Sequence, residues 1–95
     1  MIVKLVEAGY PEDLASLDAL TAVELGQFRQ WQIAQHTYWE NLYYQYQQGF
    51  LDEDYYQNEF QARVRRLAPV WDALNLGGGR RSFVEEVERL RGEVA

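Results

Sequence analysis

The chain has 95 residues, a formal net charge of −6, one histidine and no cysteine, which suits a single domain with a small core. Nucleic-acid binding relies on clustered Lys and Arg, so the acidic balance argues against it, and the cysteine and histidine counts argue against disulfides, thiol chemistry and a zinc site. A hydrophobic content of 47% with 25% charged residues is typical of a folded, soluble domain, and we expect a cytoplasmic one with no cofactor.

Residues 1–20 predict a short helix followed by a turn. Apolar side chains recur at helical spacing in residues 2–8, and Gly9 follows them, as glycine often does just past the end of a helix. Pro11 then interrupts the helix, because proline lacks the backbone donor of a helix interior and restricts the residue before it.

A strong local signal starts a long helix at Thr21. Thr21 and Glu24 form a capping box, in which each side chain accepts a hydrogen bond from a backbone N–H that the helix start would otherwise leave without a partner. No proline follows before Gly49, which can adopt the left-handed conformation that ends a helix. We therefore predict a helix over residues 21–48, about 40 Å long.

A second helix is predicted over residues 53–67, joined to the first by the short connection 49–52. Asp52 is its expected N-cap, and the acidic residues at its start and the arginines at its end oppose the helix dipole. Side chains spaced by four, four and three define its inward face: Tyr56, Phe60, Val64 and Leu67. Residues 21–67 thus predict a long antiparallel helical hairpin in an all-α fold, with residues 1–95 forming one domain.

Residues 68–95 predict a short helix, a glycine-rich linker and a C-terminal helix. Pro69 suits the first turn of a separate helix over residues 70–74, and Gly77–Gly79 reads as a flexible linker. Ser82, followed three residues later by a glutamate, forms a second capping box that opens the last helix. The apolar side chains of that helix repeat at intervals of four, three and four: Phe83, Val87, Leu90 and Val94.

His36 and Glu40 are the first candidate site. They lie four residues apart on the long predicted helix and so share one face, a spacing that can hold a metal ion or orient a general base. A helical zinc site needs a second histidine, which this chain lacks. We favour the alternative, a polar helix face with a local hydrogen bond, and predict no catalytic and no metal-binding residue.

The segment Gly77–Ser82 is the second candidate. It combines a glycine run, two guanidinium groups and a helix N-terminus, which together could hold a phosphate or a carboxylate. The anion-binding residues would be Arg80, Arg81 and Ser82. The spacing and the lysine of a Walker A loop are missing, and the alternative is a linker with solvated arginines. A small anion- or phosphate-binding domain, or an enzyme that uses this loop, is our second functional hypothesis.

Aromatic residues are concentrated between Phe28 and Phe60, a stretch that holds 11 of the 14 in the chain. No Lys or Arg lies between Arg29 and Arg63, so we expect core packing from these rings rather than stacking on nucleobases. The long helix extends beyond its 53–67 neighbour, and its N-terminal half needs another cover, which the terminal helices and a second copy could supply. We expect a homodimer whose interface contains three residues: Leu25, Phe28 and Trp31.

The run from Tyr38 to Asp52, with Trp71 and the segment Phe83–Val84, resembles the conserved hypothetical bacterial proteins that end in a small helical domain. In those proteins a similar pattern closes a long helix, and hydrophobic spans often lie upstream. The resemblance covers roughly residues 9–90. It implies a fold, and a membrane tether only through sequence upstream of this chain, and those proteins have no established activity to carry over. Our leading hypothesis is a non-catalytic interaction or self-association domain, in the cytoplasm or at the cytoplasmic face of a membrane, which binds itself or another protein.

Overall fold

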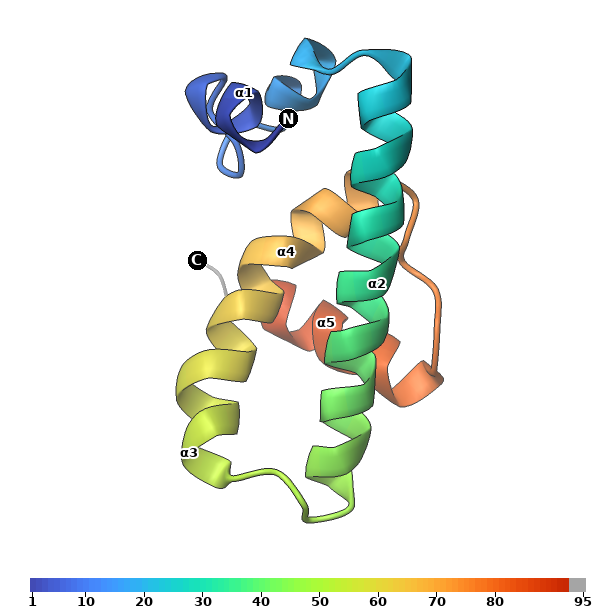
Figure 1. The fold of residues 1–95 in the computed structure, drawn as a ribbon. Coiled ribbons are helices and arrows are strands. Elements are labelled where there is room, and N and C mark those ends of the chain that lie inside the picture. The colour runs from blue at the N-terminus through green and yellow to red at the C-terminus, as the bar shows by residue number, and fades with distance from the viewer. Residues whose placement is uncertain (93–95) are drawn as a thin grey trace.

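The computed structural model describes residues 1–92, and within that range every regular element is a helix (Figure 1). A long helix forms one arm of a hairpin, a continuous helical segment forms the other, and the last helix packs against both arms. In chain order the elements are α1 (Ile2–Glu7), the 3₁₀ helix η1 (Leu14–Ala19), α2 (Ala22–Gln47), α3 (Glu53–Tyr55), the π-helix η2 (Tyr56–Phe60), α4 (Gln61–Ala73) and α5 (Arg81–Gly92). The predicted all-α hairpin with short flanking helices is confirmed. None of the helices in residues 1–92 has the length and apolarity needed to cross a membrane.

The capping box at the start of α2 forms as predicted. Thr21 Oγ1 accepts a hydrogen bond from the backbone N–H of Glu24 at 3.1 Å, and Glu24 Oε1 accepts one from the backbone N–H of Thr21 at 2.9 Å. Glu24 also pairs with Lys4 of α1, and this contact, together with the Thr21 N–H, lowers the pKa of Glu24 to about 2. At the other end of the hairpin Gly49 has a φ of 81°, and Asp52 caps α3.

The second arm corrects the prediction of two separate helices, 53–67 and 70–74. The arm runs without a break from Glu53 to Ala73, and Pro69 lies inside α4. A proline inside a helix removes one backbone hydrogen bond and costs about 3 kcal/mol. The side chains next to it are nevertheless buried in the core: Ala68, Val70 and Trp71. The burial of these side chains by an uninterrupted helix offsets the cost of the proline. Local sequence patterns do not report this burial, so they predict a break at Pro69.

The main core lies between the two arms and α5. Its buried side chains are mostly aromatic, as expected for the aromatic run: Trp39, Tyr56, Phe60, Val64, Trp71, Phe83 and Leu90. Tyr46 and Tyr56 stack with ring centroids 3.7 Å apart and planes 4° apart, which links α2 to the second arm. The π-helical turn η2, in which the N–H of Gln61 donates to the carbonyl of Tyr56, presents Tyr56 and Phe60 to this core.

A second, smaller core joins the N-terminal segment to the first half of α2 and to the end of α4. Its fully buried centre consists of Leu5, Phe28 and Val70. Half-buried leucines of η1 and its flanks pack around this centre: Leu14, Leu17 and Leu20. Gln32 is also buried; it accepts a hydrogen bond from Trp71 Nε1 at 3.1 Å and donates to the hydroxyl of Tyr10 at 3.4 Å. The N-terminal segment therefore covers Phe28, in the half of α2 for which the sequence predicts a cover from the terminal helices and a second copy.

The last helix corrects the predicted capping box at Ser82. α5 begins at Arg81, so Ser82 lies in its first turn, and its hydroxyl donates to Gln47 Oε1 at 3.4 Å. The backbone enters the helix one residue before Ser82, and the hydroxyl is drawn to α2 instead. The apolar stripe of this helix faces the main core through Phe83, Val87 and Leu90. Val94 lies outside the described residues.

Candidate functional site

The structure brings the two sequence candidates together. The segment from Leu76 to Arg80, which leads from α4 to α5, runs along the side of α2 that carries His36 and Glu40. The backbone N–H of Arg80 donates to Glu40 Oε2 at 2.7 Å. Gly79 lies over both side chains, so that a Cβ on it would overlap Glu40 and approach His36 to 3.2 Å. This glycine segment, residues 76–80, therefore contacts α2 through Gly79 and Arg80.

Gly79→Ala is expected to lower the free energy of unfolding by about 1–3 kcal/mol. Gly79 has a φ of 109°, which side chains rarely tolerate, and its new Cβ would push the Glu40 carboxylate away from the N–H of Arg80. Gly78→Ala is the matched control, because a Cβ at that position meets nothing within 4 Å. Urea unfolding of both variants measures the difference, and equal losses would contradict this account of the segment.

The arginines of the candidate anion site already have partners within the chain. The Arg80 guanidinium lies 4.5 Å from the ring centroid of Tyr44, and Arg81 Nε lies 3.2 Å from Glu85 on the next turn of α5. The backbone N–H of Arg80, which an anion at the start of α5 would use, donates to Glu40. A phosphate at this position would have to displace a carboxylate of the protein and would be repelled by it.

His36 is half-buried among aromatic rings rather than set up as a base. Its ring lies edge-on to Trp71 and Phe83, with centroids 4.8 Å and 5.2 Å away. Burial lowers the pKa of His36, and the negative charge of Glu40 partly offsets this effect. Among residues 1–92, no group of three or more His, Asp or Glu side chains is placed to hold a metal ion. In the structure Glu40 binds the backbone N–H of Arg80, and His36 packs against the two rings.

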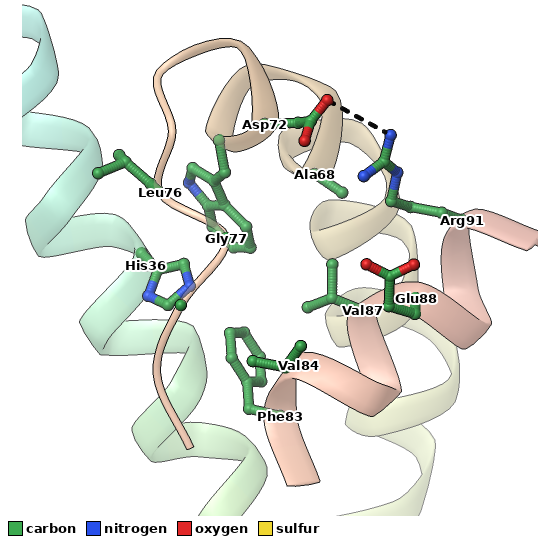
Figure 2. A pocket seen from close by; sticks show the side chains of 12 residues that line it. His36, Ala68, Asp72, Leu76, Gly77, Phe83, Val84, Val87, Glu88 and Arg91 are labelled. Atoms are coloured by element: carbon green, nitrogen blue, oxygen red, sulfur yellow. Dashed lines mark ion pairs between the residues drawn. The ribbon is translucent and has the colours of Figure 1, made fainter. Parts of the chain in front are cut away.

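A small cavity of about 50 Å³ lies under the glycine segment, between α2, α4 and α5 (Figure 2). His36 and Phe83 point toward it from one side, whereas Asp72 and Arg91 lie at the other side with charged atoms 3.8 Å apart. Ligand pockets usually measure about 300–1,000 Å³, so this cavity has room for water and not for a substrate.

A groove of about 350 Å³ lies on the other side of the glycine segment. Its polar lining consists of His36, Thr37, Glu40 and Asn75. The carboxylate of Glu40 is engaged with Arg80, and the imidazole of His36 packs against two rings.

The structure separates the three predicted interface residues. Phe28 is fully buried, with Tyr10 edge-on to its ring at 5.5 Å, and its side chain is not available to another molecule. Trp31 also packs edge-on to Phe28, at 5.8 Å, yet it stays 42% exposed. Leu25 is 37% exposed. Leu25 and Trp31 can still meet a second molecule, whereas the N-terminal segment folds over Phe28 and removes it from the predicted interface.

The outward side of α2 is exposed and carries almost no charge. Arg29 is the only charged residue among the exposed positions of this helix. The side chains on this surface, which we call the α2 outer face, are Val23, Gln27, Gln30, Trp31, Ala34, Tyr38 and Asn41. Exposed aromatic rings combined with few charges are typical of interface centres. The sequence contains a signal for this face, because Glu40 is the only charged residue between Gln30 and Gln48.

Sequence reasoning also missed a buried carboxylate, Glu86 of α5. It accepts hydrogen bonds from the hydroxyl of Tyr56 and from two nitrogens of Arg89, Nε at 2.7 Å and Nη2 at 3.0 Å. Glu86 lies three residues after Phe83 and four before Leu90, inside the apolar stripe, and that position was a usable signal. The three polar groups satisfy one another where the second arm meets α5, which indicates a structural role.

No protein-family model, no curated protein and no solved structure matches this chain.

Proposed function

We propose that this chain is a non-catalytic helical module that associates with itself through the α2 outer face. One observation carries the proposal. Along its 26 residues α2 exposes the rings of Trp31 and Tyr38, the latter 52% exposed, but only one charged side chain, that of Arg29. Most exposed helix faces are rich in charge, because charged side chains keep a protein in solution at little cost. An uncharged face with large rings gains free energy when a second surface removes it from water.

The polar groups of the candidate site support a structural role rather than a catalytic one. Glu40 binds the backbone of Arg80, and His36 packs against aromatic rings, so both act within the chain. The alternative of an anion-binding domain or enzyme at Gly77–Ser82 has less support, because Glu40 already occupies the N–H at the start of α5. We also propose a cytoplasmic location for this module, as expected from the sequence.

Sedimentation velocity from micromolar to millimolar concentration tests the proposal. We expect a monomer–dimer equilibrium, and we expect Trp31→Ala to raise the dissociation constant at least about tenfold, as for an aromatic hot spot. Because Trp31 also packs against Phe28, urea unfolding at low concentration must show that the variant remains folded. Val3→Ala is the matched control, since Val3 is an exposed apolar residue on α1, outside the proposed surface. A clean monomer at millimolar concentration would remove the basis of the proposal.

A further inference from the structure

We infer that a groove between α2 and α4 binds a small ligand that carries one carboxylate on an apolar body. This α2–α4 groove has a volume of about 490 Å³, which lies within the usual range for ligand pockets. The site is separate from the α2 outer face and goes beyond the proposed self-association. Two facing helices line it: α2 with Gln35 and Trp39, and α4 with Ala62, Arg63, Arg66 and Leu67.

The α2–α4 groove is also separate from the glycine segment. Gln35 lies about 140° around α2 from Glu40, the residue that binds the backbone of Arg80. The groove and the glycine segment therefore flank α2 on different sides. An anion bound in the groove would not compete with Glu40 for the start of α5.

The lining of the α2–α4 groove combines buried apolar side chains with exposed cations. Trp39 is buried in the main core and Leu67 packs against that core, while Ala62 adds a methyl group. Arg63 and Arg66 lie three residues apart, so their side chains project from neighbouring turns of the same helix face. A ligand that fits both parts has an apolar body against the buried side chains and an anionic group at the guanidinium groups.

The present partners of the two arginines are exchangeable. Arg66 Nη2 lies 3.3 Å from Glu12, and Arg63 Nε lies 3.3 Å from Glu59. All four side chains are at least 50% exposed, and exposed pairs of this kind contribute little stability. The contact with Glu12 shows that Arg66 can hold a carboxylate at this place. The two glutamates would repel a multiply charged anion, so the site favours a ligand with a single negative charge.

The indole of Trp39 supplies a second polar group at the α2–α4 groove. Among the buried side-chain polar atoms of residues 1–92, only Trp39 Nε1 and Ser16 Oγ have no hydrogen-bond partner. Buried donors in folded proteins nearly always have one. The indole of Trp71 follows this rule, because it donates to Gln32 at 3.1 Å. An oxygen atom of a ligand beside Trp39 would accept a hydrogen bond from its N–H.

NMR of the tryptophan indole N–H groups tests the site, with hexanoate as the probe. We expect the Trp39 signal to shift and to saturate, whereas the Trp71 signal stays in place because its N–H is already bonded to Gln32. Hexanol has the same apolar body without the charge, so it should bind at least about tenfold more weakly. An unmoved Trp39 signal, or equal affinities for hexanoate and hexanol, would overturn the inference.

Variants of charged residues test the position of the carboxylate. We expect Arg66→Gln to raise the dissociation constant of hexanoate at least about fivefold. Glu12→Gln should instead lower it by about two- to fivefold, because it releases Arg66 from its present partner. Arg81→Gln is the matched control, since Arg81 is an exposed arginine of α5 outside the groove. A loss of binding in Arg81→Gln with none in Arg66→Gln would place the anion at Gly77–Ser82 and contradict the site.

N-acetyl-leucine distinguishes two sources of the carboxylate, a free acid and the C-terminus of a peptide. Tighter binding of N-acetyl-leucine than of hexanoate would indicate a peptide terminus, and weaker binding would indicate a free acid. Both results support the site. If the amide of N-acetyl-leucine bound as tightly as the acid, the ligand would need no carboxylate and the inference would fail. Sedimentation velocity of Arg66→Gln should match that of the unmodified chain, because the α2 outer face does not include Arg66.

Discussion

Phe28→Ala is expected to lower the free energy of unfolding by about 3–5 kcal/mol, the usual cost of removing a buried phenylalanine ring. Phe28 is fully buried, and the second core contains it together with Leu5 of α1 and Val70 of α4. The ring therefore joins three segments that are far apart in the sequence. A domain of this size has a total stability of about 5–15 kcal/mol, so the loss would be a large share of it. Urea unfolding measures the change.

Leu25→Ala is the matched control for this prediction. Leu25 lies on the same helix but is 37% exposed, so its truncation should cost less than about 1 kcal/mol. The loss caused by Phe28→Ala should also appear at protein concentrations where the chain is monomeric, because the ring packs within one copy. If Phe28→Ala weakened the dimer and left the stability of the monomer unchanged, the second core would be described wrongly.

Arg89→Met is expected to lower the free energy of unfolding by about 3 kcal/mol. The variant would leave the buried Glu86 carboxylate without the guanidinium that neutralises it, while the hydroxyl of Tyr56 would still donate to it. The value lies at the low end of the range for breaking a buried ion pair, because the Arg89 side chain is 47% exposed and water can partly replace it. Urea unfolding at pH 7 measures the loss.

Two further variants make this prediction specific. The double variant Glu86→Leu/Arg89→Met should recover most of the loss, because it removes the buried charge together with its counter-ion. Arg81→Met breaks an ion pair with Glu85 on the same helix, and since both side chains are exposed it should cost less than about 0.5 kcal/mol. A double variant less stable than Arg89→Met, or equal losses from the two arginine variants, would contradict the role given to Glu86.

The candidate site was predictable as two separate pieces. His36 with Glu40, and the segment Gly77–Ser82, each carried a local pattern of chemistry in the sequence. Their meeting was not predictable, because the hydrogen bond from Arg80 to Glu40 joins residues 40 positions apart. In the folded chain the Glu40 carboxylate accepts a hydrogen bond from the Arg80 N–H, which would otherwise be available to an anion. The same contact joins the C-terminal end of the glycine segment to α2.

The interface prediction failed at Phe28 for a related reason. The sequence of α2 shows that Phe28 needs an apolar cover. It cannot show that the chain before Thr21 folds back and supplies that cover. The α2 outer face, by contrast, follows from helical spacing once the helix itself is established, and the exposed positions of the structure show which side of the helix it occupies.

The sequence by itself determined the all-α class, the N-cap of α2 at Thr21, the turn at Gly49 and the cap at Asp52, because caps and helical spacing depend on residues within about four positions. Tertiary structure decided the rest. The helix continues through Pro69 because the core gains from its burial, and the chain before α2 covers Phe28 because the two surfaces meet only after folding. Contacts between distant segments depend on how the hairpin and the terminal helices pack, and no local pattern contains that information.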